Sequence, residues 1–338
     1  MTVLPRACSV AIGLLLVAAS ARAQTAMVQD STLDNLVHAP GYVTSAPGTL
    51  GAVVERGKGP IPMILVSGFG LGASAFEGFM SRNATRYRMF AVTLPGFEGT
   101  PAPPMPPPGT SYGAQTWTAA AAEAIAELIR ERKLDRPVLV GHSLNGTQVV
   151  LRLAVDHPEL SRAAVLLAGS PRFEPVISTR SWPKNLTARQ KMRGVDESFA
   201  PRWFKTVTRE TWVSNNFKAT DYSVDSVRGK HFADLANAAP LPVLVRYLCE
   251  YHASDGWLDV PRLQRPTLVF QPQFTASLRA DTTRSYLQGF FVEPWKGFAD
   301  AGGKAEGLEV ENAGILVMED QPAFVDRRIE DFLKRLEP

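Results

Sequence analysis

Short apolar runs recur along the chain and leave room for a helix between them. Most of these runs are continuous rather than alternating, which is typical of parallel strands covered on both faces. Residues 115–134 place Trp117, Ile125 and Leu128 on one helical face between two such runs. Strand, helix and strand in alternation predict a mainly parallel α/β sheet. The predicted strands lie between Pro62 and Gly68, Arg88 and Pro95, Pro137 and Gly141, Ala163 and Gly169, Pro266 and Gln271, and Gly307 and Asn312, with weaker edge strands near Tyr42 and Thr49.

The alternation stops between residues 171 and 260, a region that holds four of the six tryptophans. We expect residues 171–260 to form a mostly helical cap over the carboxyl edge of the sheet. Residues 24–170 and 261–338 then form the core of the fold. The aromatic side chains of the cap either line an apolar pocket as a lid or pack into a small core of their own, and the sequence leaves both open.

The first 23 residues have the pattern of a secretory signal peptide. Arg6 precedes an apolar run from Ala7 to Ala19, and the small residues Ala21 and Ala23 precede Gln24. The run is too short to span a bilayer core of about 30 Å. We therefore expect a secreted or periplasmic protein with no membrane attachment after cleavage. Cys8 would be removed, which leaves Cys249 as the only thiol and excludes an intramolecular disulfide.

Charge and motifs exclude several classes of partner. The net charge of +3 is small for 338 residues, so nothing indicates binding to nucleic acid or to anionic lipid. The chain has no H-E-x-x-H motif, cysteine pair or close histidine cluster, so no metal site is expected. Residues 68–73 match a dinucleotide-binding pattern, but the next strand ends at Thr93-Leu94-Pro95 without the required acid. We expect a small-molecule substrate or ligand and no cofactor.

The segment Gly141-His142-Ser143-Leu144-Asn145-Gly146 places a serine where a strand must turn sharply into a helix. Such a turn exposes the serine hydroxyl at the sheet edge, so Ser143 is the candidate nucleophile. The same turn directs the Leu144 amide toward the position of an oxyanion. The loop at Gly68-Phe69 offers the Phe69 amide as a second donor, and each donor contributes on the order of 3 kcal/mol in comparable sites.

Five blocks of sequence together resemble the α/β-hydrolase superfamily over most of residues 42–336. The blocks are Val66-SGFG, Thr93-LPGFEGT, Val140-GHSLNG, Leu258-DVPRLQRPTLVF and Asn312-AGILVMEDQPAF. The resemblance implies an α/β-hydrolase fold, with a mainly parallel central sheet flanked by helices. It also implies a serine hydrolase that cleaves a small, largely apolar ester or amide.

Two departures from the family pattern affect the chemistry. Ile315 stands where the family has its catalytic histidine, and Thr275 stands where it usually has the acid. A serine hydroxyl needs a positioned base, and isoleucine cannot accept its proton. Serine proteases that lack one triad member still hydrolyse their substrates roughly 10³ to 10⁴ times faster than the uncatalysed reaction in water. The alternatives are therefore a hydrolase with an unusual base and a catalytically silent protein that binds a small apolar ligand.

Five histidines are present, and two of them are candidate bases. His142 neighbours Ser143, but consecutive side chains diverge at a tight turn, so a packing role is expected. His157 is expected at a solvated helix end. His231 and His252 both lie in residues 171–260, from which a cap could lower an imidazole onto the serine.

Overall fold

A computed structural model describes residues 45, 48–178, 183–297 and 304–336. The proposed signal peptide at residues 1–23, the predicted strand near Tyr42 and Trp182 lie outside these residues. The strands form one seven-stranded sheet in the order β1-β3-β2-β4-β5-β6-β7, in which only β1 is antiparallel to its neighbour. Their bounds are β1 Ala52–Arg56, β2 Ile61–Val66, β3 Tyr87–Thr93, β4 Val138–His142, β5 Ala163–Leu167, β6 Thr267–Gln273 and β7 Ala305–Glu311.

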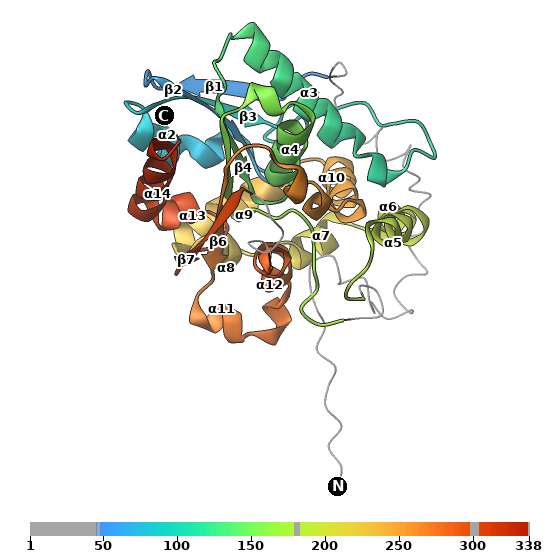
Figure 1. The fold of residues 1–338 in the computed structure, drawn as a ribbon. Helices are drawn as coiled ribbons and strands as arrows, with labels where there is room; N and C mark the ends of the chain where they lie inside the picture. Colours follow the sequence, from blue (N-terminus) through green and yellow to red (C-terminus); the bar gives the residue numbers. More distant parts are fainter. Residues whose placement is uncertain (1–44, 46–47, 179–182, 298–303, 337–338) are drawn as a thin grey trace.

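Helices cover both faces of the sheet (Figure 1). Helices α3 (Thr116–Glu131) and α4 (Ser143–Asp156) pack together on one face, and α2 (Glu77–Asn83) lies with α14 (Pro322–Lys334) on the other. The short helix α13 (Val317–Asp320) contacts both α2 and α14. The predicted α/β-hydrolase fold with a mainly parallel sheet is confirmed. The weak pattern after Thr49 is confirmed as the edge strand β1.

Between β5 and β6 the described residues form helices and no strand, in agreement with the predicted cap. The exact boundaries at residues 171 and 260 stay a prediction. A second helical stretch, which the sequence did not indicate, separates β6 from β7. The helices between β5 and β6 are α5 Ala188–Gly194, α6 Ala200–Thr206, α7 Arg209–Asn215, α8 Ala219–Tyr222, α9 Ser226–Ala238 and α10 Leu241–Ala253, with a π-turn at Val195–Phe199; the later stretch holds α11 Ala276–Ala280 and α12 Tyr286–Phe291.

Helix α10 fastens the cap to the core. Its Glu250 carboxylate accepts hydrogen bonds from the Trp117 and Thr118 amides, both 3.0 Å long, and so caps the first turn of α3. Arg246 pairs with Glu250 at 2.8 Å, and both side chains are buried. Cys249 lies on the same helix, and burial raises the pKa of its thiol. In the described part of the chain, no helix combines the length and apolar character that crossing a membrane requires.

Candidate active site

Ser143 is the first residue of α4 and directly follows β4. Its φ angle is +55°, a left-handed conformation that costs a non-glycine residue of order 1–3 kcal/mol. A Cβ on Gly146 would lie 2.5 Å from the Val66 carbonyl oxygen, so only glycine lets α4 approach β2 this closely. The strained turn that the sequence predicted around Ser143 is therefore present, but only 3% of the Ser143 surface is exposed, so the expected exposure of its hydroxyl is not observed.

The loop after β2 lies against the serine. A Cβ placed on Gly68 would be 2.8 Å from both the Ser143 Cβ and the His142 Nδ1, so glycine is required there too. The next amide along the loop belongs to Phe69, and no hydrogen bond of the described residues begins at it. The Leu144 amide lies in the first turn of α4, where main-chain N–H groups lack partners within the helix. Neither amide donates a hydrogen bond that the structure records in its described residues, and Phe69 directly follows the glycine that lies against Ser143.

The cap holds the Phe69 ring in place. Its centroid lies 6.0 Å from that of Trp212 on α7 and 6.1 Å from that of Phe97. Within the cap, Trp203 packs against Phe199 on one side and edge-on against Trp212 on the other. The cap aromatics therefore belong to the same hydrophobic cluster as the residues of the sheet, and through Trp212 they reach the loop that carries Phe69.

Ile315 lies in the loop that follows β7, and only 1% of its surface is exposed. Its amide donates to the Asp221 carbonyl at 2.8 Å, and its carbonyl accepts a hydrogen bond from His142 Nε2 at 3.0 Å. Because a carbonyl only accepts, Nε2 carries the proton of the neutral ring and Nδ1 has a free lone pair. Burial lowers the pKa of His142 to about 4, so the ring is neutral at physiological pH. The predicted packing role of His142 agrees with this contact.

Thr275, at the position where the resemblance predicted an acid, carries no carboxylate. Thr275 follows β6 and caps α11, and its hydroxyl bonds that of Ser277 at 3.0 Å. After β5, Ser170 donates a hydrogen bond from its hydroxyl to the Phe290 carbonyl and also contacts the Tyr251 hydroxyl.

The structure does not join either predicted base to Ser143 by a hydrogen bond among the described residues. His231 is exposed on α9 and lies against Phe232. His252 is buried in an aromatic cluster with Phe173, Phe199 and Phe290, and burial lowers its pKa to about 3. His157 lies at the end of α4, as predicted, but its ring is only partly exposed and pairs with Glu123 at 2.9 Å. The imidazole that lies beside the serine is that of His142.

A buried carboxylate near the triad positions escaped sequence reasoning. Asp221 on α8 bonds Arg284 and the Tyr286 hydroxyl, while its main-chain carbonyl holds the Ile315 amide. Burial raises the pKa of Asp221, although the Arg284 charge opposes that rise. No local signal marks this residue, because its partners come from distant segments. The described residues contain no group of three or more histidine, cysteine or acidic side chains that could hold a metal ion.

Comparison with known proteins places these features in context. A model of the alpha/beta hydrolase family matches residues 63–328. A pimeloyl-(acyl-carrier protein) methyl ester esterase from Aeromonas hydrophila subsp. hydrophila is 28% identical over 176 residues, which are 52% of this chain and only 61% of that relative. An esterase from Thermogutta terrifontis superposes with a TM-score of 0.59 at 20% identity and covers 85% of this chain and 94% of its own. An esterase from Exiguobacterium antarcticum superposes with a TM-score of 0.60 at 16% identity, and the match covers 83% of this chain and 94% of that esterase.

Proposed function

Because this chain belongs to the alpha/beta hydrolase family, we propose that it is a serine hydrolase of small, largely apolar esters or amides, with Ser143 as nucleophile. The observation that carries the proposal is the left-handed turn at Ser143, which places a strained serine at the start of a helix at the carboxyl edge of the sheet. The Phe69 and Leu144 amides serve as the oxyanion donors. The name of the relative from Aeromonas hydrophila supports an ester as the first substrate class to test.

In this mechanism, Ser143 Oγ attacks the carbonyl carbon and its proton passes to a base. The carbonyl oxygen becomes an oxyanion that the two amides stabilise. The alcohol or amine then leaves with a proton, and water hydrolyses the acyl group from the serine. We expect slow turnover, because the Ile315 side chain offers no proton acceptor, and burial lowers the pKa of His142 and of His252 so far that either ring would accept a proton inefficiently.

The direct test measures hydrolysis of p-nitrophenyl acetate and p-nitrophenyl octanoate by the wild-type protein and by Ser143→Ala. We expect turnover above background that Ser143→Ala abolishes. Ser161→Ala is a matched control, because Ser161 is buried, its hydroxyl has no hydrogen-bond partner in the described structure and it precedes β5 at the opposite edge. Equal turnover in the wild type and in Ser143→Ala would contradict the proposal.

Three variants then identify the base. His231→Ala and His252→Ala test the two histidines of the cap. His142→Ala tests the imidazole beside Ser143, whose Nδ1 lone pair faces Gly68. The base is the histidine whose loss lowers kcat without changing the far-ultraviolet circular dichroism spectrum.

A second candidate function is the binding of a small apolar ligand without turnover. Ile315 favours it, because a buried aliphatic side chain replaces the polar group at the centre of a triad. A serine-directed fluorophosphonate probe separates the two functions. Labelling of the wild type but not of Ser143→Ala supports the hydrolase, whereas no labelling together with no ester turnover supports the binding protein.

We also propose export to the periplasm or the medium, from the pattern in residues 1–23. Expression of the full chain should give a mature protein that begins at Gln24, which amino-terminal sequencing of each cell fraction measures. A cytoplasmic protein that retains Met1 would contradict this proposal.

A further inference from the structure

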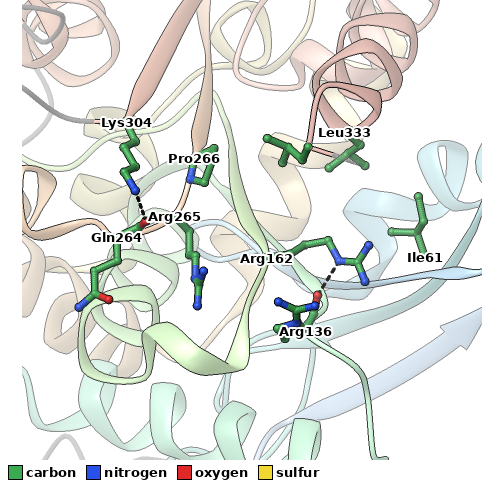
Figure 2. Close-up of a pocket in the computed structure, with 9 residues that line it drawn as sticks. Ile61, Arg136, Arg162, Gln264, Arg265, Pro266, Lys304 and Leu333 are labelled. Atoms are coloured by element: carbon green, nitrogen blue, oxygen red, sulfur yellow. Dashed lines mark hydrogen bonds between the residues drawn. The ribbon is translucent and has the colours of Figure 1, made fainter. Parts of the chain in front are cut away.

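A cavity of about 320 Å³ opens at the edge of the sheet opposite Ser143 (Figure 2). Its lining comes from the amino ends of the parallel strands and from α14, whereas Ser143 follows the carboxyl end of β4. We call it the basic cavity. Its lining residues are Ile61, Arg136, Arg162, Gln264, Arg265, Pro266, Lys304, Leu333 and Leu336.

The lining holds four cationic side chains and no carboxylate. Arg136 has one neighbour of opposite charge, the mostly exposed Asp135 at 3.5 Å. Arg162 and Arg265 are half-buried and form no ion pair with any described residue. Positive charge of this kind is costly to leave uncompensated beside an apolar surface.

Main-chain carbonyls hold the two half-buried guanidinium groups in position. Arg162 Nε donates to the Arg136 carbonyl at 2.9 Å, a bond drawn in Figure 2, and its Nη2 donates to the Asp135 carbonyl at 3.3 Å. Arg265 Nε donates to the Pro158 carbonyl at 3.0 Å. Each guanidinium has five N–H donors, so most donors of both groups remain available. Fixed guanidinium donors of this kind match the oxygens of a phosphate group.

We propose that the basic cavity binds the phosphate group of a small organic phosphomonoester. Arg162, Arg265 and Lys304 contact the phosphate, while Leu333, Leu336 and Ile61 contact the apolar part of the molecule. The volume falls within the range of about 300–1,000 Å³ that is usual for small-molecule sites. The site lies on the other edge of the sheet from Ser143, so it does not depend on the function proposed above.

Isothermal titration calorimetry of the whole protein at low salt tests the site with inorganic phosphate and phenyl phosphate. We expect both to bind, phenyl phosphate more tightly, and both to weaken when salt screens the charges. Sedimentation with phosphatidic acid vesicles separates a free phosphomonoester from a lipid headgroup. Binding to vesicles without any heat from phenyl phosphate would overturn the small-molecule site.

Single substitutions connect the binding to the cavity. Arg265→Gln and Lys304→Gln should each weaken phenyl phosphate binding about tenfold, which is the usual loss for one charge-assisted hydrogen bond. Lys304 is exposed and bonds only the Gln264 carbonyl, so its loss leaves the fold intact. Arg193→Gln is the control, because Arg193 is exposed on α5 and pairs with Glu197. Equal affinity in all three variants, or no binding by the wild type at millimolar concentration, would overturn the proposal.

Discussion

At Ile315, where the resemblance predicted a histidine, the side chain offers no proton acceptor, while the main chain bonds two neighbouring segments. The Ile315 carbonyl still holds His142, and its amide still bonds Asp221. The strained turn at Ser143 is likewise retained. If Ser143 is the nucleophile of the proposed hydrolase, its turn is formed but Ile315 cannot serve as its base.

Ile315→His should raise kcat/KM for p-nitrophenyl acetate by roughly 10²-fold. In a well-studied serine protease, the variant that lacks only the acid has a kcat about that factor higher than the variant that lacks all three triad residues. Ile315→Gln is the matched control, since it adds a polar group that cannot act as a base. A similar gain in Ile315→Gln, or activity that persists in the double variant with Ser143→Ala, would contradict a role for the added imidazole.

Two buried histidines make stability depend on pH. Burial lowers the pKa of His142 to about 4 and that of His252 to about 3, against about 6.5 in the unfolded chain. Below pH 6.5 the unfolded state binds more protons, so the free energy of unfolding is highest above that pH and decreases as pH falls toward the folded pKa values. Between pH 7.5 and pH 5 the loss should be about 2 kcal/mol per histidine.

Urea denaturation at pH 7.5 and pH 5 measures this loss. His252→Gln should reduce it by about 2 kcal/mol relative to the wild type, because only one buried imidazole remains to be protonated on unfolding. An unchanged loss in His252→Gln would show that this histidine is not the source.

The residues that the sequence identified are those with local signals. Ser143, Gly68 and Ile315 follow strands at fixed positions within short motifs, and the structure places the three segments together at one sheet edge. Asp221 could not be found in this way, because its contacts to Ile315 and Arg284 join segments far apart in the chain. The base stays unidentified for the same reason: cap packing, which no motif encodes, fixes where His231 and His252 lie.

At the scale of elements, α10 replaces a local helix cap with a long-range one. Gln115 precedes α3 but makes no side-chain cap, and Glu250 of α10 bonds the first amides instead. The helix pattern at residues 115–134 predicted α3, but it gave no sign that another element would cap it. The sequence likewise predicted six parallel strands from continuous apolar runs, yet missed the helices between β6 and β7.

Glu250→Ala should lower the free energy of unfolding by about 3–5 kcal/mol, because it strips two amides of their acceptor and leaves Arg246 buried without its partner. Urea denaturation measures the change. Glu197→Ala removes an exposed pair with Arg193 at the same spacing and should cost under about 0.5 kcal/mol. Similar losses in the two variants would show that Glu250 has no special role.

At the scale of the molecule, cap and core share one hydrophobic cluster among the described residues. Phe69 of the core packs on Trp212 of the cap, and Tyr247 of α10 bonds the Pro95 carbonyl at 3.1 Å. The basic cavity also belongs to this scale, since four separate segments before strands bring its cations together. Such assembly explains why composition alone, with a net charge of only +3, gave no sign of an anion site.

A shared cluster predicts that cap and core unfold together. Tryptophan fluorescence mainly reports unfolding of the cap, because the cap holds four of the six tryptophans. Far-ultraviolet circular dichroism reports the loss of all helices and strands. The two signals should show one midpoint in urea. A fluorescence transition at clearly lower urea would show that the cap unfolds separately from the sheet.

Because Cys249 on α10 is buried, the rate at which its thiol reacts reports how often the fold opens around it. Thiol reagents attack the thiolate, and burial both raises the pKa of Cys249 and closes access to it. The rate of Cys249 alkylation, followed by mass spectrometry, therefore measures the opening that separates α10 from its neighbours in the cap and the core. In the proposed mature protein, which lacks Cys8, a cysteine introduced on the surface would for the same reason accept a dye without competition from Cys249.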